Sequence, residues 1–192
     1  MEAILTSAVD APSRDINPIT SMFPDIKVYS GIVGREAGLN CKGNYMLGSG
    51  HTGCGLSIYA IWEDFLQSKE EWLFMFESDA EPLITREEFD NIWKFRPNVK
   101  VAWLQYDDLG LYKGMSPRIT PINKYWFRTT NPISFCAMAF HRDALMGFKR
   151  ELRLPVDMLF LSYIKARRLP YATAKLFKHN DSTSNTRIDS GK

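Results

Sequence analysis

Short apolar runs alternate with amphipathic segments along most of this chain. The runs that predict β-strands cover residues 4–8, 26–30, 72–76, 99–106, 134–140 and 171–177. The segments with helical spacing or helix-start signals, which predict α-helices, cover residues 15–22, 52–68, 85–93, 142–150 and 156–168. The run at 72–76 is apolar throughout, which indicates a strand buried on both faces. We therefore expect a single α/β domain with a mixed, mostly parallel central sheet flanked by helices.

Cap and turn signals define several boundaries of these segments. Thr85 and Glu88 match a capping box, the reciprocal pair of hydrogen bonds that starts many helices. The glycines between residues 48 and 55 predict a loop that leads into a helix. Residues 107–128 are irregular, with room for one short strand, and residues 181–192 have the polar, aperiodic composition of a loose tail. The domain is therefore expected to span residues 1–180.

Composition narrows the possible partners and the compartment. The 192 residues are 45% hydrophobic and 24% charged, which is enough apolar material for a full core. A net charge of +2 is too small for a nucleic-acid-binding surface, so no nucleic-acid partner is expected. The chain shows neither a signal-peptide pattern nor an apolar stretch of about 20 residues, so no transmembrane segment is expected. Cys41, Cys54 and Cys136 are widely spaced and odd in number, which favours a reducing compartment and a cytoplasmic protein.

Three carboxylates follow the most apolar strand within a few residues. Glu77, Asp79 and Glu81 come directly after the run at 72–76, and ligands of α/β sheets bind at the carboxyl ends of strands. Clustered carboxylates repel one another, and Mg²⁺ or Mn²⁺ relieves this repulsion while phosphate oxygens complete the coordination shell. The pattern predicts a site for Mn²⁺ or Mg²⁺. The alternative is an acidic turn with solvated side chains.

Several motifs, spread over residues 4–185, follow one another as in a known enzyme family. They are Ile4-Leu5-Thr6-Ser7 with Arg14, Gly53-Cys54, Leu56-Ser57, Trp62, Glu77-Ser78-Asp79-Ala80, residues 134–140 and Pro155-Val156-Asp157. Together they resemble glycosyltransferase family 25, the lipopolysaccharide-type glycosyltransferases. Two positions differ from the family's pattern. Ile58 stands where the family has a histidine, and Ser78 stands in place of the middle acid, which leaves a Glu-x-Asp version of the Asp-x-Asp metal motif.

The resemblance implies a GT-A fold and a metal-dependent glycosyltransferase. Such an enzyme moves a sugar from a nucleotide-sugar donor, here expected to be a UDP-hexose, to a glycan or glycoprotein acceptor. The metal would be held by Glu77, Asp79 and His179, and the residues implied in catalysis are Asp79 and Asp157. The residues implied in donor binding are Ser7, Ala8, Arg14, Gly53, Ser57, Glu77 and Ser78.

Other interpretations of the same residues stay open. His179 is equally typical of a surface loop, and Asp157 of the N-cap of a helix. The glycine-rich segment before residue 53 lets backbone N–H groups approach a phosphate, but no Walker lysine follows it. Two alternative functions suit the carboxylates. One is a nucleotidyltransferase or phosphohydrolase with the same metal site, and the other is a non-catalytic module that binds a nucleotide-sugar or a glycan.

Overall fold

Strands and helices alternate along the chain, as the hydrophobic pattern predicts. The computed structural model describes residues 1–8, 14–34, 49–106, 118–130, 132, 134–152 and 154–180, with the backbone alone at Ser7, Ala8 and Ser49. The strands are β1 (Glu2–Ala8), β2 (Lys27–Gly31), β3 (Trp72–Glu77), β4 (Ala80–Pro82), β5 (Val101–Gln105), β6 (Ile119–Pro121), β7 (Phe127–Thr129), β8 (Ala137–His141) and β9 (Tyr171–His179). The helices are α1 (Asn17–Met22), α2 (Ser49–Gln67), α3 (Arg86–Lys94), α4 (Arg142–Met146) and α5 (Val156–Arg167).

The strands of the described ranges form one mixed sheet in the order β2-β1-β3-β8-β5-β9-β7-β6, and β4 pairs with β9 beyond this path. β1 pairs in parallel with β2 and β3, and β5 pairs in parallel with β9. β8 is antiparallel and lies between β3 and β5, while the β6–β7 hairpin continues the sheet beyond β9. Because β1, β2, β3, β5 and β9 run in one direction, the prediction of a mixed, largely parallel sheet is confirmed.

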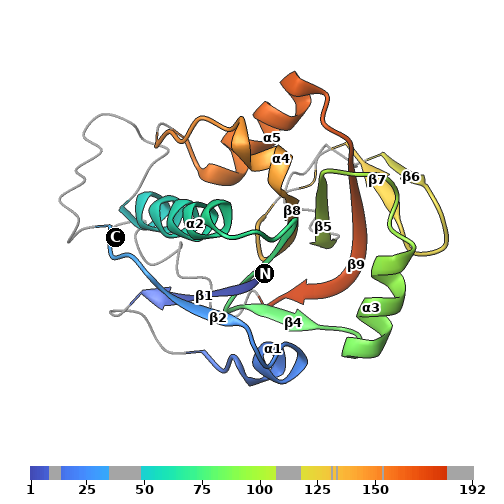
Figure 1. Cartoon of the computed structure of the whole chain (residues 1–192), viewed down its shortest axis with the longest axis horizontal. Coiled ribbons are helices and arrows are strands. Elements are labelled where there is room, and N and C mark those ends of the chain that lie inside the picture. Colours follow the sequence, from blue (N-terminus) through green and yellow to red (C-terminus); the bar gives the residue numbers. More distant parts are fainter. Residues whose placement is uncertain are drawn as a thin grey trace.

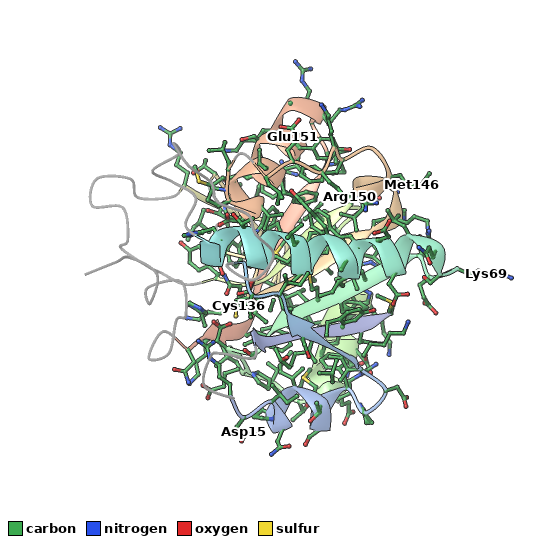
Figure 2. All side chains as sticks on the ribbon, turned by 90° about the vertical axis from the view of Figure 1, so that its left-hand side faces the viewer. Asp15, Lys69, Cys136, Met146, Arg150 and Glu151 are labelled. Carbon is green, nitrogen blue, oxygen red and sulfur yellow. The ribbon has the colours of Figure 1, made fainter. Side chains whose placement is uncertain are left out.

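Helices cover both faces of this sheet (Figure 1). Side chains alternate between the faces along β3, since Leu73 and Met75 join the core with α2, α4 and α5, whereas Phe76 joins the core with α1 and α3. Figure 2, turned by 90° from Figure 1, shows Asp15 beside α1 on one side of the sheet and Glu151 on the opposite side. The prediction that this strand is buried on both faces is confirmed.

The first turns of α2 lie against the segment that follows β2. A Cβ atom on Gly53 would stand only 2.2 Å from the carbonyl oxygen of Ile32, so glycine alone allows this close approach of two backbones. Ser57 joins the same two segments, because its hydroxyl accepts a hydrogen bond from Ile32 N at 2.8 Å and donates one to Gly53 O at 2.7 Å. In the structure α2 begins at Ser49, so the prediction that residues 49–51 belong to a loop is wrong.

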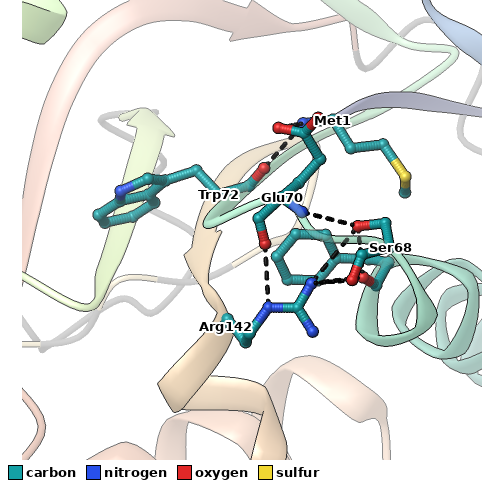
Figure 3. A network of polar contacts seen from close by, with 6 residues as sticks. Met1, Ser68, Glu70, Trp72 and Arg142 are labelled. Atoms are coloured by element: carbon teal, nitrogen blue, oxygen red, sulfur yellow. Dashed lines mark hydrogen bonds and ion pairs between the residues drawn. The ribbon is translucent and has the colours of Figure 1, made fainter.

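The other end of α2 is held by Arg142, the first residue of α4 (Figure 3). Its guanidinium donates hydrogen bonds to the carbonyl oxygens of Leu66 and Ser68 at 2.8 Å, and to those of Phe65 and Glu70 at 3.0 Å. The last carbonyl groups of a helix have no partner within the helix, and Arg142 supplies one. With both ends fixed, α2 holds its N-terminal half against the carboxyl ends of β1 and β3.

The capping box at the start of α3 is present as predicted. Glu88 N donates to Thr85 Oγ1 at 3.3 Å, and Thr85 N donates to Glu88 Oε2 at 2.8 Å. Other boundaries differ from the prediction. β4 was not expected, α4 ends at Met146 rather than at residue 150, and residues 118–130 contain two short strands instead of one. The predictions for Gly48, for residues 107–117 and for the tail at 181–192 lie outside the described residues.

Candidate functional site

Side chains from distant parts of the chain meet at the carboxyl end of β3. Backbone hydrogen bonds fix the acidic turn that follows this strand: Ser78 N donates to Leu5 O at 2.9 Å, and Asn180 N donates to Asp79 O at 3.0 Å. The turn is thereby tied to β1 and to the end of β9. The side chains that gather around it are Arg14, Cys54, Glu77, Asp79, Asp157 and His179.

Asp79 is the best-connected member of this group. Its carboxylate is 9% exposed, and one oxygen, Oδ2, accepts from Arg14 Nη1 at 2.7 Å and from His179 Nε2 at 3.0 Å. Burial opposes ionisation of Asp79, but the hydrogen bonds and charges of His179 and Arg14 outweigh it and lower the pKa of this carboxyl group. The structure thus brings His179 and Asp79 into contact, and their role as ligands of one metal stays a prediction.

Glu77 has the opposite electrostatic environment. Burial, followed by the negative charge of Asp79, raises the pKa of Glu77 to about 8, and the charge of Asp157 acts in the same direction. Cys54, on α2, points its thiol at Glu77 with 3.9 Å between Sγ and Oε1. Burial and the charge of Glu77 raise the pKa of Cys54, so the thiol stays protonated and can act as a weak donor to Glu77.

Asp157 lies in the first turn of α5, and the N-cap of that helix is Pro155. The interpretation of Asp157 as the N-cap residue is therefore wrong. Its carboxylate accepts a hydrogen bond from Met158 N at 2.9 Å. The negative charge of Asp157 also contributes to the raised pKa values of Glu77 and Cys54, so this carboxylate is coupled electrostatically to the acidic turn.

The other residues predicted for donor binding fall into two groups. Ser7 and Ala8 end β1, where the structure describes the backbone alone, and Ser78 follows β3 with its side chain partly exposed. Gly53 and Ser57 connect α2 to the segment after β2, as described above, and both are buried. Their positions link the site to the helix that covers it.

Two contacts of the site are not predicted by the sequence. One is the ion pair between Arg14 and Asp79, and the other is the approach of Cys54 to Glu77. The family resemblance places Arg14 at the nucleotide and gives Cys54 no role beyond its motif. The partners are 65 and 23 residues apart, and no local signal reports such pairs.

The donor atoms at this site are of the kind that Mn²⁺ and Mg²⁺ take, namely carboxylate oxygens with one imidazole. Asp79 Oδ1 is buried and has no hydrogen-bond partner among the described residues, so this oxygen can still accept a hydrogen bond or bind a cation. In the part of the chain that the structure describes, however, no three His, Cys, Asp or Glu side chains are arranged to hold an ion. The donors suit a cation, and Arg14 occupies the carboxylate that would bind it.

Two surface grooves in the described ranges lie away from this site. One, of about 440 Å³, lies between α3, the β6–β7 hairpin and β9, and the other, of about 350 Å³, lies at the opposite end of β3 beside His141. None of the six gathered side chains lines either groove. These two grooves therefore do not mark the site, which is located by its chemistry and its position in the sheet.

No protein-family profile matches the chain, and no curated protein matches its sequence. Among solved structures it is similar to A197 from STIV, with a TM-score of 0.54 and 15% identity over 95% of this chain and 87% of that one. It is also similar to CMP:2-keto-3-deoxy-manno-octonic acid synthetase complexed with CTP, with a TM-score of 0.53 and 11% identity over 98% and 93%. A glycosyltransferase involved in glycosylation of the PBCV-1 major capsid reaches a TM-score of 0.48 and 16% identity over 98% and 96%, too low a score to carry an argument.

These likenesses show the fold. The chain is a single α/β domain of the GT-A/nucleotidyltransferase-like kind, in which a mixed, largely parallel sheet is flanked by helices. At these identities they show no specific family and no particular reaction. None of the helices in the described residues is long and apolar enough to cross a membrane.

Proposed function

We propose that this protein is a metal-dependent glycosyltransferase that moves a sugar, expected to be a hexose carried on UDP, to a glycan or glycoprotein acceptor. One observation carries the proposal. Glu77, Asp79, Asp157 and His179 come from three separate parts of the fold and gather at the carboxyl end of β3. Strand ends of this kind are where α/β sheets bind nucleotides.

Each residue has a role in this proposal. A bound Mn²⁺ would neutralise the diphosphate leaving group. Asp79, Glu77 and His179 would hold that cation, and Arg14 would bind phosphate oxygens through its planar guanidinium. Asp157, at the start of α5, would bind a sugar hydroxyl or take the proton of the acceptor hydroxyl.

A nucleotidyltransferase is the second candidate, because a structural neighbour with a TM-score of 0.53 is a synthetase complexed with CTP. The charge of the site argues against it. Among the described residues gathered here, one arginine and one histidine are the only basic side chains, and both already contact Asp79. A nucleoside triphosphate carries more negative charge than a nucleotide-sugar and needs more cationic side chains.

Thermal unfolding in the presence of nucleotides tests the proposal. The ligands are UDP-glucose, UDP-galactose and CTP, each with Mn²⁺ or with a chelator. A ligand at 100 times its dissociation constant stabilises the protein by about 2.7 kcal/mol, which raises the melting temperature by roughly 5–10 °C for a domain of this size. We expect this rise with a UDP-sugar and Mn²⁺, and none with the chelator.

Product analysis separates the two enzymes. Release of UDP from the UDP-sugar in the presence of acceptor glycans, abolished in Asp79→Asn, supports the glycosyltransferase. Stabilisation by CTP with release of pyrophosphate would overturn the proposal in favour of the nucleotidyltransferase. Stabilisation by UDP-sugars that depends on neither Mn²⁺ nor Asp79, without turnover, would identify a non-catalytic binding module.

A further inference from the structure

One oxygen of Asp79 is shared by two cationic or hydrogen-bond-donating groups. Oδ2 accepts from Arg14 Nη1 at 2.7 Å and from His179 Nε2 at 3.0 Å, and all three side chains are at most 15% exposed. Oδ1, the second oxygen, is buried with no hydrogen-bond partner in the described ranges. A divalent cation approaching from solvent therefore finds one oxygen occupied and the other covered.

Charge strengthens this obstruction. The guanidinium of Arg14 is permanently positive, and a cation bound beside it would be repelled at short range in a poorly solvated site. Arg14 lies between β1 and α1, outside both elements, so its side chain can leave Asp79 without breaking a strand or a helix. The orphaned Oδ1 shows that one arginine and one histidine do not satisfy this carboxylate completely.

We propose that Arg14 occupies the place of the cation on Asp79 in the ligand-free protein and moves to the diphosphate when a nucleotide arrives, so that cation and nucleoside diphosphate bind as one unit. This inference rests on the proposed function. The diphosphate provides the anionic oxygens that a guanidinium binds best. Departure of Arg14 from Asp79 removes a positive charge and one of the two donors on Oδ2, which makes this oxygen available to the cation. By linkage, each ligand then strengthens binding of the other by the same factor.

Binding of Mn²⁺ alone is the direct test, since it needs no turnover. Free Mn²⁺ is measured by electron paramagnetic resonance during titration of the protein, with and without UDP, after correction for the Mn²⁺–UDP complex in solution. We expect the parent protein to bind Mn²⁺ weakly alone and about tenfold or more tightly with UDP. Arg14→Gln should bind Mn²⁺ alone about tenfold more tightly than the parent and gain less than about threefold from UDP.

Two further variants separate charge from geometry. Arg14→Lys keeps a positive charge near Asp79 but lacks the planar fork, so it should bind Mn²⁺ alone as weakly as the parent. Arg150→Gln is the matched control, because Arg150 pairs with Glu63 on the surface at 3.4 Å and its loss changes the net charge equally. This control should behave like the parent in every titration.

The outcomes distinguish this inference from the function on which it rests. If the parent gains affinity from UDP but Arg14→Gln binds Mn²⁺ alone no better than the parent, the inference is wrong and the metal site stands. If Arg14→Gln does not fold, a gain from UDP below about threefold in the parent overturns the inference. If no protein binds Mn²⁺ with or without UDP, the proposed metal-dependent function is wrong and the inference falls with it.

Discussion

Two carboxylates only two residues apart illustrate how the surroundings of a side chain determine its ionisation. Asp79 receives hydrogen bonds from Arg14 and His179, which lower its pKa in spite of burial. Glu77 is partly buried beside Asp79, and among the described residues its hydrogen-bond donor is the weak thiol of Cys54, so its pKa rises to about 8. In the cation-free protein at neutral pH, Asp79 is therefore ionised and Glu77 is largely protonated. Pairs with divided pKa values are typical of sites that handle charge.

The raised pKa of Glu77 predicts how stability changes with pH. Because the folded pKa, about 8, lies above the reference value of 4.5, the unfolded chain releases this proton first. The protein therefore loses stability as pH rises from about 4.5 to about 8. Glu77→Gln has no proton to lose, so in a chelator it should be more stable than the parent at pH 8 by on the order of 1–3 kcal/mol, with little gain at pH 5.

Urea unfolding at pH 5 and pH 8 measures this difference. The matched control is Glu87→Gln, which removes an exposed carboxylate in the first turn of α3 and should change stability by less than about 0.5 kcal/mol at both pH values. An equal effect of Glu77→Gln at the two pH values would show that packing, rather than ionisation, determines its contribution.

At the scale of the element, α2 carries two glycines with different roles. A Cβ at Gly53 would stand 2.2 Å from Ile32 O, whereas the nearest described atom to a Cβ at Gly55 would be Leu152 Cδ2, at 3.4 Å. Gly53→Ala should therefore destabilise the protein by about 1–3 kcal/mol, because the helix must move away from the segment after β2. Gly55→Ala should be neutral or stabilising by up to about 1 kcal/mol, since alanine favours the helix.

Thermal unfolding of the two single variants measures this pair, and each serves as the control of the other. Equal effects would mean that α2 does not require the close approach at Gly53. Since α2 also carries Cys54, which contacts Glu77, a displaced helix in Gly53→Ala should also weaken the proposed nucleotide binding, whereas Gly55→Ala should leave it unchanged.

Arg142 gives a second prediction at this scale. Four carbonyl oxygens at and beyond the C-terminus of α2 depend on its guanidinium. Arg142→Met keeps much of the apolar stem but leaves these carbonyl groups without their charged donor, so unfolding in urea should show a loss of about 2–3 kcal/mol. Arg142→Lys, which can reach fewer of them, should lose less than Arg142→Met. An equal loss of stability in Arg142→Lys and Arg142→Met would show that the planar guanidinium, and not the positive charge alone, is essential.

Elements with strong local signals could be predicted from the sequence. The apolar strand with its acidic end and the capping box at Thr85 depend on residues close in the chain, and both were found. β4 was missed because Ala80-Glu81-Pro82 has the composition of a turn and becomes a strand only by pairing with residues 177–179 of β9. The start of α2 was missed because glycines disfavour helices locally, whereas here a tertiary contact requires one. The family resemblance predicts Asp79 and His179 as site residues. It does not predict that Arg14 contacts Asp79, and no local signal in the sequence reports that contact.

For the whole molecule, the sheet order determines where stability is concentrated. β3, β8 and β5 lie in the middle of the sheet with strands on both sides, and every residue of β5 and β8 is buried. β6 lies at the end of the sheet, and all its residues are exposed. Hydrogen exchange followed by mass spectrometry should therefore be slowest in peptides from β3, β5 and β8 and fastest in those from β6. Equal exchange in β6 and β3 would contradict this distribution.

The position of β9 has a consequence for synthesis on the ribosome. β9 is the last strand that the structure describes, yet it lies between β5 and β7 in the interior of the sheet. His179 leaves the ribosome 100 residues after Asp79, which at about 5–20 residues per second is an interval of roughly 5–20 s. From the emergence of β5 until β9 follows, the edge of β5 that pairs with β9 is unpaired, and Asp79 lacks its histidine throughout the interval. The nascent chain therefore exposes an unpaired strand edge, a feature prone to aggregation, in the same period in which the side-chain cluster around Asp79 is incomplete, and both conditions end when β9 inserts.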